Sequence, residues 1–269
     1  MEVNSNLLNK DNKGSVTFII TNSRSLSTVF CRILKNYPNT HLISDKFVHI
    51  HVEEKSVNKI DKSYEELAKT IEDEIDSELL KGKNVIVKDI GYYIFNYFLN
   101  VFEYYIKKYS PKIVYLIRHP VPTHLSFQKM MDKEKLIGNL QLDFIRFEEK
   151  IERYESIWNL YQLYKGYVTI VEDVQREPDK TLSYVFNYLK WGWDSKYLQF
   201  QSISDEEIKL LNDFNHWYQE CINSTEFKKS EPKVDYEFTE DWIKDKISRS
   251  MIFYNKFVDA SSDLSLNEK

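Results

Sequence analysis

The sequence predicts an α/β fold in which a doubly wound parallel sheet is flanked by helices, with a helical cap at its C-terminal end. Two observations support this prediction. Short runs of β-branched and apolar residues recur along the chain, as in strands that are covered on both faces. Segments of helical length separate these runs, and strands that alternate with helices form parallel sheets.

Four runs have the character of buried strands. They are Val16–Ile20, Asn84–Lys88, Lys112–Ile117 and Tyr167–Val171. In open parallel sheets, ligands bind beyond the carboxyl ends of the strands. We therefore expect the functional residues in the loops that follow these four runs.

The segments between the runs are expected to be helices. Thr28–Leu34 is apolar-periodic, and an apolar residue at every fourth position predicts a helix over Tyr64–Leu80 that ends at Lys81-Gly82. Residues 92–109 and 144–164 also have helical length. Residues 205–257 predict two more helices around an irregular segment, 223–238, and we expect this part to cover the site as a lid.

Length and composition favour one domain. The chain has 269 residues, of which 42% are apolar, enough for a sizeable core. No Pro/Gly/Ser-rich linker divides it, so we expect a single domain over residues 15–259, with polar tails at 1–14 and 260–269.

Charge and hydropathy argue for a soluble cytoplasmic protein. The formal net charge is −5 and the Lys and Arg residues are scattered, which is unlike a surface for nucleic acid or an anionic membrane. No apolar run approaches the ~18 residues of a membrane span, and no signal peptide is evident. Cys31 and Cys221 lack the spacing of a zinc site and are expected to be reduced and packed.

The first motif is Thr21-Asn-Ser-Arg-Ser-Leu-Ser-Thr28, between the first strand and the first helix. Backbone N–H groups at a helix N-terminus, with hydroxyls and one cation, form a site for an anion. The loop has the position of a phosphate-binding P-loop but lacks the Gly-Lys pair of a Walker A motif. A plain helix cap is the alternative.

The second motif is Ile117-Arg-His-Pro120, with Ser126 in the next helix. A guanidinium at the end of a buried strand and a hydroxyl eight residues later are able to converge on one phosphate. The alternative is a structural ion pair of Arg118 beside a solvated serine.

Four segments in this order make the chain resemble the P-loop sulfotransferase superfamily, and in particular its small bacterial-type members. They are Asn22–Thr28, Val87–Asp89, Leu116–Ser126, and Val171–Asp173 followed by Glu177–Leu182. His216–Tyr218 and Ser224–Phe227 match a later landmark, so the resemblance spans Val16–Phe227.

The resemblance implies a metal-independent enzyme whose donor is 3′-phosphoadenosine 5′-phosphosulfate (PAPS), with PAP as the product. Arg24, Ser25, Leu26, Ser27 and Thr28 would then hold the 5′-phosphosulfate. Arg118 and Ser126 would hold the 3′-phosphate, with Lys228 and Lys229 adding cations near it. Leu26 stands where many members have Gly, at a point where the backbone approaches the phosphate closely.

Catalysis would need a cation at the leaving phosphate and a base for the acceptor proton. Arg24 is the expected cation, and Lys88 is expected at the sulfuryl oxygens unless it is only a strand-end lysine. The Lys-x-His element of animal enzymes reads Lys88-Asp-Ile90 here, so its histidine is missing. Asp45, in the stretch where bacterial-type relatives place a carboxylate, is the leading candidate base, with His49 and His51 in reserve.

The expected function is transfer of a sulfuryl group from PAPS to a hydroxyl or amine of a small molecule, such as a natural product. A small-molecule kinase is one alternative, with Glu172 and Asp173 as metal ligands, although the Walker lysine is absent. A non-catalytic PAP-binding protein is another. The acidic, aromatic-rich composition is compatible with a cationic or polycyclic acceptor.

Overall fold

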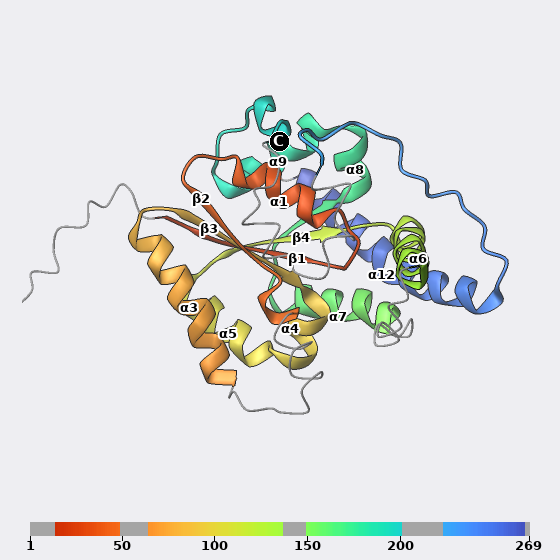
Figure 1. Ribbon diagram of the computed structural model, residues 1–269, viewed down its shortest axis with the longest axis horizontal. Coiled ribbons are helices and arrows are strands. Elements are labelled where there is room, and N and C mark those ends of the chain that lie inside the picture. Colours follow the sequence, from red (N-terminus) through yellow and green to blue (C-terminus); the bar gives the residue numbers. More distant parts are fainter. Residues whose placement is uncertain (1–13, 49–63, 137–148, 201–222, 267–269) are drawn as a thin grey trace, which may run out of the picture.

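A parallel sheet forms the centre of the molecule (Figure 1). The computed structural model describes residues 14–48, 64–136, 149–200 and 223–266. Within these residues five strands, all parallel, lie in the order β2-β3-β1-β4-β5. The strands are β1 (Val16–Thr21), β2 (Thr40–Ser44), β3 (Asn84–Ile90), β4 (Lys112–Ile117) and β5 (Tyr167–Ile170). The predicted doubly wound parallel sheet is confirmed.

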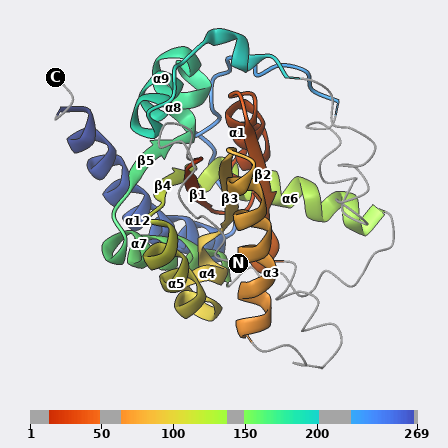
Figure 2. The same ribbon diagram turned by 90° about the vertical axis from the view of Figure 1, so that its left-hand side faces the viewer.

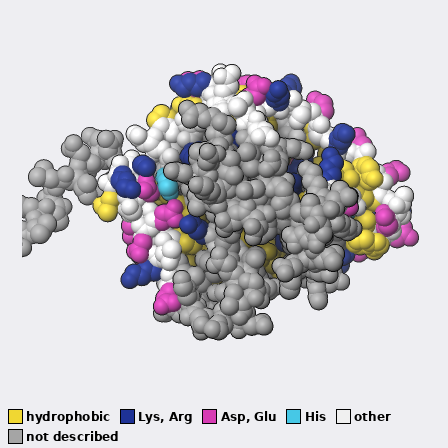
Figure 3. Space-filling model, viewed as in Figure 1, with side chains coloured by type: hydrophobic (Ala, Val, Ile, Leu, Met, Phe, Trp, Pro, Cys, Tyr) yellow, Lys and Arg dark blue, Asp and Glu magenta, His cyan; other side chains and the backbone are white. Residues whose placement is uncertain are grey.

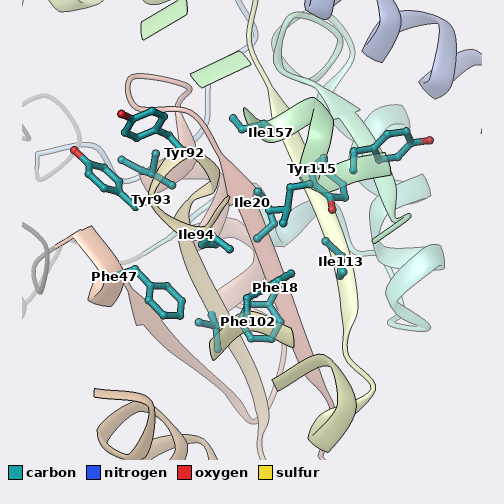
Figure 4. Packing of buried hydrophobic residues seen from close by; sticks show 14 of the residues in the cluster. Phe18, Ile20, Phe47, Tyr92, Tyr93, Ile94, Phe102, Ile113, Tyr115 and Ile157 are labelled. Carbon is teal, nitrogen blue, oxygen red and sulfur yellow. The ribbon is translucent and has the colours of Figure 1, made fainter. Parts of the chain in front are cut away.

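The central strand β1 is buried on both faces, because its side chains alternate between two apolar clusters. Phe18 and Ile20 face one cluster and Ile19 faces the other, and all three are fully buried. On the first side, the ring of Phe18 meets the ring of Phe102 edge to face, with centroids 5.1 Å apart (Figure 4). Burial on both faces explains why β1 reads as a continuous apolar run.

Helices cover both faces of the sheet, and the layers are visible in two perpendicular views (Figures 1 and 2). The Phe18 face carries α3 (Tyr64–Leu80), α4 (Gly91–Tyr97), α5 (Leu99–Tyr109), α7 (Glu149–Leu163) and α12 (Asp241–Leu266). The Ile19 face carries α1 (Ser27–Lys35), α8 (Val171–Arg176), α9 (Pro178–Leu189) and the short η2 (Ser195–Leu198). Helix α6 (Pro120–Leu136) follows β4 beside the carboxyl ends of the strands.

Two elements differ from the sequence prediction. Residues 92–109 were expected to be one helix but form α4 and α5, because Phe98 leaves helical backbone at φ −123°. Its ring is buried against Phe47, with centroids 5.0 Å apart, so tertiary packing overrides helical continuity. The edge strand β2 was not predicted, because its five residues are mostly half-buried and show no apolar run.

The C-terminal helix is longer than expected. A tail was predicted from residue 260, but α12 continues to Leu266. The helix packs against α7, β5 and α6, and that contact sustains it where the sequence itself is polar. Of the two helices predicted around the irregular segment, the first falls on residues that are mostly outside the described part of the chain, and the second is α12.

The described surface visible in Figure 3 mixes Lys and Arg with Asp and Glu side chains over the same elements. No helix in the described ranges is long and apolar enough to cross a membrane. Cys31 is a free, buried thiol, and burial raises its pKa to about 12. This agrees with the expected packing role of Cys31, whereas Cys221 lies outside the described residues.

Gly91 provides a test of the packing beneath the sheet. A Cβ at this position would lie 2.7 Å from Ile157 Cγ1 and 2.8 Å from Ile20 Cγ2, closer than real carbon contacts. We expect Gly91→Ala to lower the free energy of unfolding by about 1–3 kcal/mol through overpacking, measured by urea denaturation. Gly192→Ala is the matched control, because a Cβ there meets nothing within 4 Å, and equal losses in the two variants would contradict this account.

Candidate functional site

The loop between β1 and α1 is held in shape by its own buried side chains. The hydroxyls of Thr21 and Ser25 share a short hydrogen bond, and Ser25 Oγ also lies 2.6 Å from the carbonyl oxygen of Asn22. Ser25 is fully buried, so its hydroxyl is turned into the loop.

Two non-glycine residues of the loop have left-handed backbone. Arg24 has φ 64° and Leu26 has φ 58°, conformations that cost of order 1 kcal/mol for residues with a Cβ. Leu26 is the position where the sequence suggested that a side chain replaces glycine, and it is also the residue that precedes α1. The surrounding hydrogen bonds keep this strained turn at the start of a helix, where backbone N–H groups favour anions.

The loop and the end of β4 are joined through Arg24, Arg118 and Ser126. Arg118 Nη1 donates to the carbonyl oxygen of Arg24 at 2.7 Å, and Arg24 Nε donates to Ser126 Oγ at 3.1 Å. The structure thus brings together the residues that the sequence assigned to two phosphates. Two guanidinium groups and a hydroxyl at the carboxyl edge of the sheet are suited to a multiply charged anion.

Arg118 has unused donor capacity. Its Nε is buried and finds no hydrogen-bond acceptor among the described residues. Burial also lowers the pKa of its guanidinium, because the charged form is poorly solvated. Buried donors in native proteins nearly always have partners, so this nitrogen has room for an acceptor such as a water or an anion.

The backbone after Arg118 is fixed by Glu172. Glu172 Oε1 accepts the N–H of His119 at 3.0 Å, and Oε2 accepts the hydroxyl of Tyr254 at 3.3 Å. Burial raises the pKa of Glu172. This carboxylate therefore joins the segment after β4, the start of α8 and the middle of α12. The described residues contain no group of three His, Cys, Asp or Glu arranged for a metal.

The ends of β2 and β3 hold a second cluster. Lys88 Nζ donates to both carboxylate oxygens of Asp45, at 2.5 and 2.7 Å, and the side chain of Lys88 is 5% exposed while that of Asp45 is 20% exposed. Asp45 itself has left-handed backbone, and its N–H donates to the Lys88 carbonyl at 2.8 Å. The structure thus pairs two of the residues predicted for catalysis, and the carboxylate is the more accessible of the two.

A buried neighbour, Asp89, fixes this second cluster. Asp89 Oδ2 accepts the N–H of Phe47 at 2.7 Å and Oδ1 accepts that of Ile90 at 2.8 Å. Desolvation, reinforced by the nearby charge of Asp45, raises the pKa of Asp89 to about 8. With one ammonium near two carboxyl groups, the half-buried Asp45 takes the ion pair, and the buried Asp89 binds a proton more tightly than an ordinary aspartate does.

The remaining predicted site residues lie in different parts of the structure. Ser27 is buried and Thr28 half-buried at the start of α1, within the same loop-to-helix turn. Lys228 and Lys229 are exposed, and Lys228 Nζ lies 3.0 Å from Glu226 Oε1. Within the described residues, neither lysine is seen to contact Arg118. His49 and His51 lie outside the described residues.

Two solved structures resemble the chain over most of its length. A sulfotransferase domain from the curacin biosynthetic pathway covers 91% of this chain and 98% of its own, with a TM-score of 0.59 and 15% sequence identity. A sulfotransferase domain from the Synechococcus PCC 7002 olefin synthase covers 91% and 96%, with a TM-score of 0.57 and 14% identity. The chain has the sulfotransferase fold. By sequence, no family model and no curated protein matches it.

Two further residues contact the site but were not predicted from the sequence. Arg153 of α7 is 2% exposed and its Nη1 donates to Ser23 Oγ in the loop. The next residue, Tyr154, donates its hydroxyl to the carbonyl oxygen of Arg118 at 2.6 Å. Helix α7 therefore supports both the loop and the end of β4. The sequence did not predict the role of Arg153, because a buried arginine and a solvent-exposed arginine look alike in an amphipathic segment.

The raised pKa of Asp89 predicts how stability depends on pH. Its folded-state pKa of about 8 lies above the ordinary value of 3.8, so between these limits the folded protein holds a proton that the unfolded chain has lost. The free energy of unfolding should fall as pH rises through this window, by at most about 1.4 kcal/mol per pH unit from this group. Asp89→Asn should flatten the curve, measured by urea denaturation from pH 4 to 8. Parallel curves would show that Asp89 is ionised in the folded protein.

Proposed function

We propose that this protein is a sulfotransferase that transfers a sulfuryl group from PAPS to a hydroxyl or amine of a small molecule. The observation that supports this proposal most directly is the Arg24, Arg118 and Ser126 cluster beside the β1 loop, with a buried Arg118 donor that has no acceptor in the described structure. The fold supports the same reaction class.

The residues present fit the donor. The loop offers backbone N–H groups at the start of α1 and the guanidinium of Arg24 for the 5′-phosphosulfate. Arg118 and Ser126 are the residues we assign to the 3′-phosphate, as the sequence resemblance implied. Lys228 and Lys229 remain a weaker assignment, since both are solvent-exposed.

The proposed reaction is an in-line displacement at sulfur. The acceptor oxygen or nitrogen forms a bond to sulfur while the bond from sulfur to the 5′-phosphate oxygen breaks, and the acceptor loses its proton to a base. Arg24 and the loop N–H groups stabilise the charge that develops on the leaving phosphate. Positioning and charge stabilisation supply most of the catalysis in this kind of transfer.

We assign the base to Asp45. Its carboxylate is the accessible member of the pair with Lys88, and the two hydrogen bonds from Lys88 fix its orientation. Lys88 then acts through Asp45 and not by direct contact with the sulfuryl oxygens. The kinase alternative gains no support from its two expected metal ligands. Glu172 is buried and engaged by His119 and Tyr254, and Asp173 is exposed beside Arg176.

The first experiment is calorimetric titration with PAP, AMP and ATP plus magnesium. We expect micromolar PAP binding, weaker AMP binding and no ATP binding in the wild type. In Arg118→Ala the dissociation constant for PAP should rise roughly 10- to 100-fold, the value of hydrogen bonds to a charged group. The dissociation constant for AMP, which has no 3′-phosphate, should rise less, because AMP loses only the support that Arg118 gives to the loop through the Arg24 carbonyl.

Arg176→Ala is the control for this titration, because Arg176, the last residue of α8, is an exposed arginine that lies near Glu231. It should bind PAP as the wild type does. An equal loss of PAP and AMP affinity in Arg118→Ala would contradict the 3′-phosphate assignment. Preference of the wild type for ATP, or no PAP binding at all, would overturn the proposed function.

The base assignment is tested by Asp45→Asn. We expect PAP affinity within about twofold of the wild type and turnover with a phenolic acceptor lowered by about 10²- to 10⁴-fold, the usual contribution of general base catalysis. Asp76→Asn is the matched control, since Asp76 is also paired with a lysine, Lys108, but on the surface. Turnover retained in Asp45→Asn would exclude Asp45 and leave His49 and His51 as candidates.

A further inference from the structure

His119 stands between the two residues that we assign to the 3′-phosphate. Arg118 follows β4, and Ser126 lies in α6, the helix that begins at Pro120. The direction in which α6 leaves the end of β4 is therefore set at His119. A helix rises about 1.5 Å per residue, so Ser126 lies roughly 9 Å along α6, and a tilt of about 10° would move it by roughly 1.5 Å, enough to break a hydrogen bond.

The side chain of His119 caps α6. Its Nδ1 accepts the backbone N–H of Val121 at 3.2 Å, and its carbonyl oxygen accepts the N–H of Thr123, also at 3.2 Å. Val121 is the second residue of the helix, where a backbone N–H has no partner within the helix itself. Ser, Thr, Asp and Asn usually supply the acceptor for such an N–H. In α6 an imidazole nitrogen supplies it.

Two other helices hold His119 in place. Its backbone N–H donates to Glu172 Oε1, at the start of α8, at 3.0 Å. Its ring meets the ring of Tyr254, in the middle of α12, edge to face, with centroids 4.9 Å apart and planes at 73°. The imidazole is thus fixed from α8 and α12, and through Nδ1 it holds the start of α6 in a fixed direction.

The contact with Val121 requires a neutral imidazole. A ring nitrogen that accepts a hydrogen bond carries no proton, so the ring proton of His119 belongs on Nε2. Burial agrees with this, because it lowers the pKa of His119 from its ordinary value, against the opposing charge of Asp235. The other titratable groups beside His119 are Glu172, at its backbone N–H, and Tyr254, at its ring. Near neutral pH the ring is therefore an acceptor.

We propose that His119 is a positioning residue for the sulfuryl donor: as the N-terminal cap of α6, it sets where Ser126 lies relative to Arg118 and so determines the fit of the 3′-phosphate. His119 acts through the direction of α6 and not by contact with the nucleotide. The inference rests on the proposed function, because PAP is the ligand whose 3′-phosphate it places.

The test compares two substitutions that separate the properties of His119. His119→Phe keeps a ring beside Tyr254 but has no acceptor for the N–H of Val121. His119→Asn has no ring but keeps an acceptor, in a residue type that is preferred as a helix cap. Asp194→Ala is the control, because Asp194 caps η2 in the same way, by accepting the N–H of Lys196 at 3.0 Å. Calorimetry measures PAP and AMP binding to each variant.

We expect His119→Phe to raise the dissociation constant for PAP roughly 10-fold, the contribution of one hydrogen bond to a charged group. The dissociation constant for AMP, which has no 3′-phosphate, should change much less. His119→Asn and Asp194→Ala should bind PAP as the wild type does.

PAP affinity that stays unchanged in His119→Phe, or that His119→Asn fails to restore, would overturn the inference, while PAP binding by the wild type leaves the proposed function standing. Equal losses of PAP and AMP affinity in His119→Phe would also overturn it, because His119 would then support the whole site. No PAP binding by the wild type would overturn the proposed function itself.

A second measurement needs no ligand. NMR of the ring nitrogens near neutral pH should show His119 as the Nε2–H tautomer, with its signals identified by their absence from the spectrum of His119→Asn. A proton on Nδ1 would overturn the inference, because that nitrogen would then be unable to accept the N–H of Val121.

Discussion

The hydrogen bond from Arg118 to the carbonyl oxygen of Arg24, at 2.7 Å, joins the ends of the two strands between which a ligand would lie. It orients the carbonyl of a residue in left-handed backbone and so fixes the turn that leads into α1. Tyr154 holds the carbonyl of Arg118 in the same way, at 2.6 Å. The loop, the end of β4 and helix α7 are thereby positioned as one unit, to which both Arg24 and Arg118 belong.

This arrangement explains how the loop dispenses with glycine. A phosphate-binding turn needs left-handed backbone, which glycine adopts without strain. Here Arg24 and Leu26 adopt it, and the buried pair of Thr21 and Ser25 hydroxyls stabilises the turn from inside. The cost, of order 1 kcal/mol for each residue, is modest relative to the hydrogen bonds that hold the turn closed.

The sequence predicted the sheet well, because strands buried on both faces give apolar runs that do not depend on their neighbours. It failed at β2 and at Phe98, where the outcome depends on contacts with distant residues such as Phe47. For the site, the loop and Arg118 were predictable from their position after strands. Arg153 was not, because an arginine in a helix looks the same in sequence whether it faces solvent or contacts the loop, as Arg153 does through Ser23.

The pocket beside the β1 loop is lined by residues from opposite ends of the described chain. The loop with Arg24 lies between the first strand and the first helix, whereas Lys246 and Ser250 belong to α12, the last helix of the described residues. During synthesis the strands and the loop emerge first, and α12 follows only when the sheet it packs against has already been made. A nascent chain would therefore acquire the β1 loop long before the helix that packs beside it, and a chain released early would leave that side of the loop open to water.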